Sequence, residues 1–377
     1  MYLDTAATAP VRREALEAAW PFLTGEFGNP SSHHQVGERA AAALDDARAR
    51  VARVLGMRSG DISFTSGGTE ADNLAVIGVS LASSRGRHLV TSPTEHEAVL
   101  ESADYLRRRH GFDVTYVDVS PDGTVTPEAL RAALRENTAL VSLSYANNEI
   151  GTIADVPALA AIARGHGVPF HTDAVQAAGW LPLAGLGADA VTLAGHKVGA
   201  PKGIGVAAIR GRVPVEPIIH GGGQERGRRS GTENVAFAVA LATALELAES
   251  EREDAASGAR AVRDAFISRV LTDAPGAFLT GSASSRLPNH ASFCFSDTSG
   301  EAVLLELERR GITASSGSAC AAGSDEASHV LTAIGIDAAI AQTSVRFTFP
   351  AGASPQHAES AATAVAASVR SLARSFT

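Results

Sequence analysis

Short runs rich in apolar and β-branched residues alternate with helical patterns between about residues 60 and 210. The strand-like runs are DISFTS (61–66), RHLVTSP (87–93), DVTYVDV (113–119), ALVSLSY (139–145), PFHTDAV (169–175), DAVTLAG (189–195) and GIGVAAIR (203–210). A helix is predicted at 126–137, with Thr126 as its N-cap and Pro127 at its first position. This alternation predicts an α/β fold with a mostly parallel seven-stranded sheet, whose ligands bind beyond the carboxyl ends of the strands.

The second part of the chain has a different pattern. A helix rich in Ala and Glu, at about 234–256, is predicted to lead out of the sheet. The segments that follow it predict a smaller α+β unit, namely ASFCFSD (291–297), GEAVLLELERRG (300–311), SVRFTF (344–349) and a final helix that begins at Ser354 and Pro355. We therefore expect a large domain at 12–250 and a small domain formed by 1–11 and 251–377.

Composition and charge narrow the range of possible functions. Among the 377 residues, 45% are hydrophobic and 19% are charged, which is typical of a globular protein. The net charge of −9 argues against direct binding of nucleic acid, which requires clustered Lys and Arg. The start MYLDTAATAP resembles no targeting signal, and no apolar run is long enough to span a membrane, so a cytoplasmic protein without a membrane partner is expected.

Lysine is almost absent from the chain. Lys197 and Lys202, both in AGHKVGAPKGIG (194–205), are the only lysines, and the other basic residues are arginines. Arginine can replace lysine where only a charge is needed, but it cannot act as an amine. At least one of the two lysines is therefore a candidate for a Schiff base with a carbonyl, above all the aldehyde of pyridoxal phosphate (PLP). Chance survival on a loop is the alternative.

Two further patterns fit the same cofactor. FTSGGTEADN combines a strand, a glycine turn and a helix start, so its backbone N–H groups and Thr69 suit a phosphate. Asp173 ends a predicted strand, three residues before Gln176, where a carboxylate can pair with a protonated pyridine nitrogen. Alone, the first is compatible with an ordinary turn and the second with a helix cap. Together with Lys197 they form the arrangement that PLP requires.

These motifs belong to a longer series. In order, the chain contains YLDTAAT, FGNPSSHH, FTSGGTEADN, TEHEAV, NNEIG, HTDAVQ, GHKVGAPKGIG, GGGQERGRRSGT, SSGSAC and SVRF. With them the chain resembles the cysteine desulfurases of the NifS/IscS type, in the class V aminotransferase family of fold-type I PLP enzymes. The resemblance implies conversion of L-cysteine to L-alanine, with the sulfur passed to an acceptor: an iron–sulfur scaffold, a tRNA-thiolation enzyme or the machinery that places sulfur in the DNA backbone.

The resemblance also implies roles for residues. Lys197 would be the Schiff-base lysine, Cys320 would carry the sulfur as a persulfide, and His96 would stack on the ring and help to move the substrate α-proton. The remaining cofactor contacts that it implies are Asp173 to the pyridine nitrogen, Gln176 to the ring oxygen, Gly68, Thr69 and His196 to the phosphate, and Thr232 from the second subunit of a homodimer. Asn148 would contact the cofactor and help to position the substrate, and Arg346 would bind the substrate carboxylate.

The chain departs from many members of the family at Ala194, where they have a serine whose hydroxyl contacts the phosphate. We therefore expect modestly weaker retention of the cofactor.

Cys320 lies in SSGSACAAGSDEASH, which has no helical or strand period and predicts an exposed loop. The length of that loop resembles the group whose mobile loop delivers sulfur to scaffolds. Cys294, between two phenylalanines in ASFCFSD, is expected to be buried and inert.

Two alternatives remain at this point. A different PLP-dependent lyase or aminotransferase, such as a selenocysteine lyase, would keep Lys197 and Asp173 but would not need Cys320. A non-catalytic sulfur carrier or assembly scaffold would have kept the fold and lost the cofactor. The retention of lysine, aspartate, histidine and cysteine together argues against the scaffold.

Overall fold

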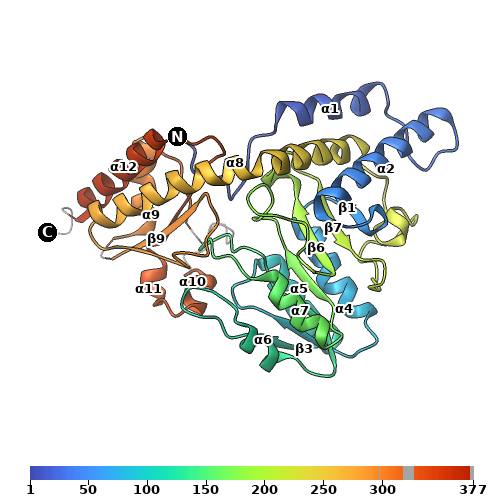
Figure 1. Ribbon diagram of the computed structural model, residues 1–377, viewed down its shortest axis with the longest axis horizontal. Helices are drawn as coiled ribbons and strands as arrows, with labels where there is room; N and C mark the ends of the chain where they lie inside the picture. Colours follow the sequence, from blue (N-terminus) through green and yellow to red (C-terminus); the bar gives the residue numbers. More distant parts are fainter. Residues whose placement is uncertain (297, 317–326, 374–377) are drawn as a thin grey trace.

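A seven-stranded sheet contains every strand predicted between residues 60 and 210 (Figure 1). The computed structural model describes residues 1–296, 298–316 and 327–373. Across the sheet the order is β1 (Ile62–Thr65), β7 (Gly205–Ile209), β6 (Ala190–Ala194), β5 (Phe170–Asp173), β4 (Thr138–Ser142), β2 (His88–Thr91) and β3 (Asp113–Tyr116). Only β7 runs antiparallel to its neighbours β1 and β6. The predicted mostly parallel sheet is confirmed.

Helices cover both faces of this sheet, because successive residues of a strand point to opposite sides. Leu89 and Leu140 face the layer formed by α3 (Gly68–Asn73), the π-helical η2 (Leu74–Gly78), α4 (Val79–Ala82) and α5 (Glu97–His110). Val90 and Val141 face the layer formed by α1 (Arg13–Thr24), α2 (Gln35–Leu55), α6 (Pro127–Ala133), α7 (Val156–Gly165) and the first half of α8 (Val235–Asp273).

A second, three-stranded antiparallel sheet forms the centre of a smaller unit, as predicted. Its order is β10 (Val345–Thr348), β9 (His290–Phe295) and β8 (Ala277–Leu279), and the helices around it are α9 (Gly300–Arg309), α10 (His329–Ala333), α11 (Ala338–Ala341) and α12 (Pro355–Ala373). Phe266 packs edge-to-face on Phe293, Phe347 and Phe349, with ring centroids 5.0 to 5.9 Å apart. These aromatic contacts stabilise the packing of α8 against the small sheet.

Helix α8 is longer than predicted and joins the two units (Figure 1). Leu241 and Leu245 are buried in the core of the large sheet, whereas Val262 and Phe266 are buried in the core of the small one. The boundary that we predicted at residues 250 and 251 therefore falls inside one continuous helix of 39 residues, and the division into two domains stays a proposal. No helix in the described part of the chain is both long and apolar enough to cross a membrane.

The first residues of the chain connect the two units. The backbone of Leu3 bonds to Thr313 and Thr348 at the edge of the small sheet, at 2.8 Å each. A few residues later, Ala9 donates to the carbonyl of His196 at 2.9 Å and Arg12 donates to the carbonyl of Gly199 at 2.8 Å. The N-terminal segment therefore runs from β10 to the short helix η3 (Gly195–Lys197), which follows β6.

The glycine turn after β1 lies directly against β7. Thr65 and Gly205 are paired in the β1–β7 ladder, and a Cβ atom on Gly205 would lie 2.5 Å from the carbonyl carbon of Gly67. A Cβ atom on Gly68 would lie 3.2 Å from the Cβ of Ala194. The turn can approach β6 and β7 this closely only because these positions are glycines.

We expect the substitution Gly205→Ala to lower the free energy of unfolding by about 1–3 kcal/mol, because its methyl group must displace the backbone of Gly67. Urea denaturation followed by circular dichroism measures this. Gly258→Ala is the matched control, since nothing lies within 4 Å of the added Cβ inside α8, and it should stabilise by about 0.5–1 kcal/mol. Equal stability of Gly205→Ala and the wild type would contradict the tight packing.

Candidate active site

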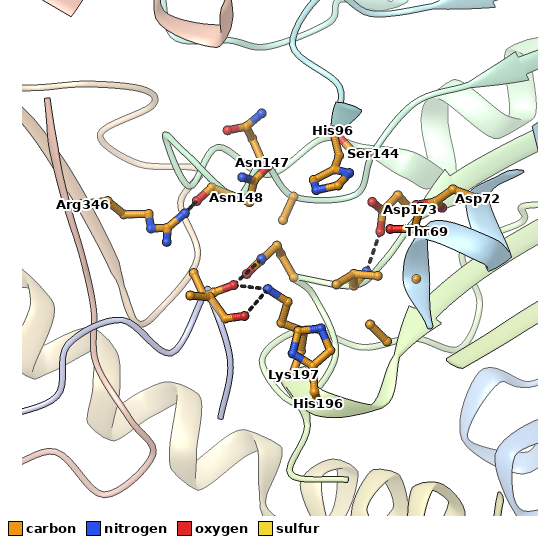
Figure 2. A pocket seen from close by; sticks show the side chains of 17 residues that line it. Thr69, Asp72, His96, Ser144, Asn147, Asn148, Asp173, His196, Lys197 and Arg346 are labelled. Carbon is orange, nitrogen blue, oxygen red and sulfur yellow. Dashed lines mark hydrogen bonds between the residues drawn. The ribbon is translucent and has the colours of Figure 1, made fainter. Parts of the chain in front are cut away.

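A cavity of about 280 Å³ lies where the carboxyl ends of β4, β5 and β6 meet the start of α3 (Figure 2). It is the location expected for the ligand of such a sheet. The predicted residues that line it are Gly68, Thr69, His96, Asn148, Asp173, Gln176, His196, Lys197 and Arg346. Cys320 lies outside the described residues, and Thr232 does not line the cavity.

Lys197 ends η3, and its side chain points into the cavity (Figure 2). Its Nζ donates hydrogen bonds to the carbonyl oxygen of Ala6 and, at 2.9 Å, to that of Ala7. Gln176 Nε2 donates to the same carbonyl of Ala6 at 3.1 Å. The amine is therefore oriented by the N-terminal segment, whereas Lys202 is exposed on the loop that follows.

Asp173 is the last residue of β5, and its Oδ1 accepts the N–H of Val175 at 2.8 Å. Burial raises the pKa of Asp173, and the nearby charges of His96 and Lys197 oppose that rise. A cation bound in the cavity next to this carboxyl would favour its ionised form further. The position therefore suits a protonated ring nitrogen.

The turn before α3 offers backbone donors to the cavity. Gly68 and Thr69 are the first residues of α3, and the N–H groups of a first helical turn have no acceptor within their helix. On the outer side of the turn, Glu70 accepts the N–H of Ser66 at 2.8 Å and pairs with Arg229 at 2.8 Å. Ala194 forms the facing wall, so no hydroxyl group lies at this position.

Two histidines border the cavity in defined orientations. His96 is the N-cap of α5, where its Nδ1 accepts the N–H of Ala98 at 3.0 Å, so Nε2 carries the proton of the neutral ring. His196 Nδ1 lies 3.2 Å from Thr8 Oγ1. Burial and the neighbouring charge of Lys197 lower the pKa of His196 to about 4, so His196 is neutral at pH 7.

Arg346 reaches the cavity from β10 of the small sheet (Figure 2). Its Nη1 donates to the carbonyl oxygen of Asn148 at 3.1 Å, and Nε2 of the buried His290 lies 3.1 Å from the same oxygen. The ring of His290 also packs on Gly151, whose positive φ of 74° turns the chain back after Asn148. The large and small sheets therefore contribute opposite walls of one site.

The structure adds a buried hydrogen-bond chain that the sequence did not indicate. Thr192 Oγ1 donates its only proton to Asp72 Oδ1 at 2.6 Å. It must therefore accept the hydrogen bond from Nε2 of His171, which lies 3.1 Å away. Burial lowers the pKa of His171 to about 3, so its Nδ1 accepts from Ser142 Oγ at 2.8 Å. Asp72 ends this chain at the cavity wall beside Asp173 (Figure 2). Burial and the Asp173 charge raise the pKa of Asp72 well above its usual range.

The segment that carries Thr232 is exposed, but its base is tied to the large sheet. Glu225, in the short helix η4 (Glu225–Gly227), forms a buried ion pair with Arg48 at 2.6 Å and accepts the N–H of Phe64 at 3.1 Å. Glu225 and Arg226 both have positive φ angles, a strained backbone that these buried contacts maintain. The contact of Thr232 with a second subunit stays a prediction.

Cys294 has the environment expected from its sequence. It is completely buried in β9, and burial raises the pKa of its thiol to about 11. A thiol of this kind is neither accessible nor ionised at pH 7.

The model of the Aminotransferase class-V family matches residues 1–351. The chain belongs to this family. A cysteine desulfurase IscS from Dictyoglomus turgidum is 44% identical over 351 residues, which cover 92% of this chain and 89% of that relative. The family match and the names of the relatives therefore confirm the predicted similarity to cysteine desulfurases of the NifS/IscS type.

Solved structures of class V relatives have the same fold. A NifS-like protein with 36% identity aligns with a TM-score of 0.91 over 99% of this chain and 100% of that one. SspA in complex with cysteine, with 33% identity, aligns with a TM-score of 0.81 over 93% of this chain and 99% of that one. The fold-type I architecture that the resemblance implied is confirmed.

A third buried carboxyl, close enough to Asp173 to interact with its charge, is Glu95, which precedes His96. Its Oε1 accepts the N–H of Ser144 at 2.9 Å, whereas its Oε2 is buried without a hydrogen-bond partner among the described residues. Burial raises the pKa of Glu95 to about 8. Glu95 is therefore largely protonated at pH 7, and Asp173 is not surrounded by further full negative charges.

This protonation predicts a pH-dependent stability. Between pH 4.5 and about 8 the folded protein keeps a proton on Glu95 that the unfolded chain has released, so this contribution to stability falls as the pH rises and levels off above pH 8. The substitution Glu95→Gln removes the titration. We expect its melting temperature to rise relative to the wild type between pH 5 and pH 8, by differential scanning fluorimetry. The control is Glu101→Gln on the exposed face of α5; a constant difference at all pH values for Glu95→Gln would refute the assignment.

Proposed function

We propose that the protein is a PLP-dependent cysteine desulfurase, which converts L-cysteine to L-alanine and holds the sulfur as a persulfide on Cys320. The observation that carries the proposal is the single cavity that brings together the Lys197 amine, the Asp173 carboxyl and the N–H groups at the start of α3. The names of the relatives support the same reaction.

The donor set fits PLP. The cofactor supplies an electron sink that stabilises negative charge at the substrate α-carbon. Lys197 would supply the amine for its aldehyde, Asp173 would pair with its ring nitrogen and Gln176 would contact its ring oxygen. Gly68, Thr69 and His196 would hold its phosphate, helped by Thr232 from the second subunit of a homodimer. His96 would stack on the ring.

The substrate meets groups from both sheets. Arg346 binds the α-carboxylate of L-cysteine, and Asn148 helps to place the substrate beside His96. Once the substrate is bound, the Lys197 amine removes the proton from the α-carbon, and His96 assists as a general acid and base.

The overall reaction balances without a further oxidant. The carbon–sulfur bond of L-cysteine breaks, and its sulfur forms an S–S bond with Sγ of Cys320. The carbon left behind takes a proton, which gives L-alanine. The sulfur is thereby oxidised and the carbon reduced, and the persulfide then passes to a sulfur-acceptor protein in the cytoplasm.

We expect Cys320→Ala to abolish sulfide release from L-cysteine in the presence of a thiol reductant while the protein keeps its yellow colour. The reason is that Cys320 accepts the sulfur, whereas Lys197 and Asp173 hold the cofactor. Methylene-blue detection of sulfide and the visible spectrum measure the two properties.

Cys294→Ala is the matched control, and it should release sulfide at a rate similar to the wild type. Turnover in Cys320→Ala would show that the persulfide mechanism is wrong and would favour another PLP-dependent lyase, such as a selenocysteine lyase. A colourless wild type that does not take up PLP would favour the non-catalytic scaffold.

A second test concerns Ala194. Ala194→Ser restores a hydroxyl to the cavity wall that faces the helix start, and one added hydrogen bond to a phosphate is worth about 1.5 kcal/mol. We therefore expect PLP to bind about tenfold more tightly. Quenching of tryptophan fluorescence during titration with PLP measures the dissociation constant, and unchanged affinity would mean that the hydroxyl does not reach the phosphate.

A further inference from the structure

The guanidinium of Arg346 has a counter-ion inside the protein. Only 3% of the Arg346 side chain is exposed, and its Nη2 donates to Oδ1 of Asp4 at 2.7 Å. Nη1 donates to the carbonyl oxygen of Asn148, and Nε is buried without a hydrogen-bond partner among the described residues. A guanidinium has five N–H donors in one plane. Donors therefore remain for a ligand after Asp4 and Asn148 have each taken one.

Asp4 is held in register with the strand that carries Arg346. Asp4 forms a parallel bridge with Thr348, two residues beyond Arg346 in β10, and Thr348 donates its N–H to the carbonyl of Leu3 at 2.8 Å. The hydroxyl of Tyr2 lies 2.9 Å from the carbonyl oxygens of both Asp4 and Thr8, which share its single proton. These contacts hold the backbone of Asp4 in place beside β10.

Two contacts from different sheets therefore hold the guanidinium. Asp4 acts from the segment that is paired with β10, and Asn148 acts from the loop after β4. A long arginine side chain loses rotamer freedom when it binds a ligand. A guanidinium group that is already oriented loses less of this freedom on binding. A buried cation without its anion is also strongly disfavoured, so Asp4 compensates the charge of Arg346 while no substrate carboxylate is bound.

We propose that Asp4 is a positioning residue for substrate recognition, which orients the Arg346 guanidinium so that its remaining N–H donors bind the α-carboxylate of an amino-acid substrate. This inference rests on the role of Arg346 in the proposed function. The inference assigns selectivity for substrates with a free α-carboxylate to Asp4 and Arg346 together. Asp4 acts through Arg346 and does not itself line the cavity.

The test compares L-cysteine with L-cysteine methyl ester, which lacks the carboxylate. The measured quantity is the ratio of kcat/KM for the two substrates, because general damage to the fold lowers both values and leaves the ratio unchanged. In Asp4→Ala we expect this ratio to fall about tenfold, mostly through a higher KM for L-cysteine. In Asp4→Asn, whose amide oxygen can still accept from Nη2, we expect the ratio to stay within about threefold of the wild type.

Thr5→Val provides the matched control. Thr5 Oγ1 donates to the carbonyls of Thr348 and Phe349, so the control loosens the same attachment to β10 without removing a partner of Arg346. Its ratio should match that of the wild type. A fall as large as in Asp4→Ala would overturn the proposal, because the attachment rather than the carboxylate would then be responsible. An increased ratio in Asp4→Ala would also overturn it, since Asp4 would then oppose the substrate carboxylate.

A binding measurement separates this inference from the proposed function. Calorimetric titration of the PLP-loaded protein with L-alanine and with L-alaninamide reports carboxylate selectivity even if the wild type releases no sulfide. We expect Asp4→Ala to lose about tenfold of the preference for L-alanine, and Arg346→Gln to lose at least as much. If Arg346→Gln loses the preference and Asp4→Ala keeps it, the positioning role of Asp4 is wrong and the role of Arg346 stands.

Discussion

The geometry of the site depends on a single helix that two hydrophobic cores bury at once. The first half of α8 packs with α1 and α2 against the large sheet, and its second half packs through Phe266 against the small sheet. Because a helix is stiff along its axis, the two sheets hold a fixed relative position. Lys197 at the end of β6 and Arg346 in β10 consequently face the same cavity. The packing of apolar residues thus sets the separation between Lys197 and Arg346 across the cavity.

Burial also decides the charges in the site. Asp72, Glu95 and Asp173 are all buried, and burial raises the pKa of each. Three neighbouring carboxylates would repel one another, so the proton stays on the groups that lack the favourable charges near Asp173. The charges of His96 and Lys197 favour the ionised form of Asp173, whereas the charge of Asp173 itself opposes ionisation of Asp72 and Glu95. The neutral His171 and His196 add no compensating positive charge, so the positive charge near Asp173 comes from His96 and Lys197.

Much of this site was predictable because its side chains lie at the ends of strands with clear apolar patterns. Asp173 and Lys197 follow such strands directly. Asp72 could not be found in the same way, since an acid inside a helix resembles a solvent-facing residue until the helix is docked on β6. The contribution of Ala6 and Ala7 was also invisible, because they act through backbone carbonyls. The full length of α8 was missed because the buried positions of its second half, such as Val262 and Phe266, belong to the core of the small sheet, and a mostly exposed stretch at about 249–258 separates them from the first half.

The N-terminal segment has a consequence for the order in which the protein can form. Asp4 and Arg346 are 342 residues apart in sequence, and Lys197 bonds to a carbonyl that lies 191 residues before it. During synthesis the segment around Asp4 leaves the ribosome long before its partners in β10, because the two are more than 300 residues apart. The large sheet can assemble meanwhile, but the site is closed only when β10 captures the beginning of the chain. Completion of the cavity is therefore a late event in folding, controlled by contacts of very high sequence separation.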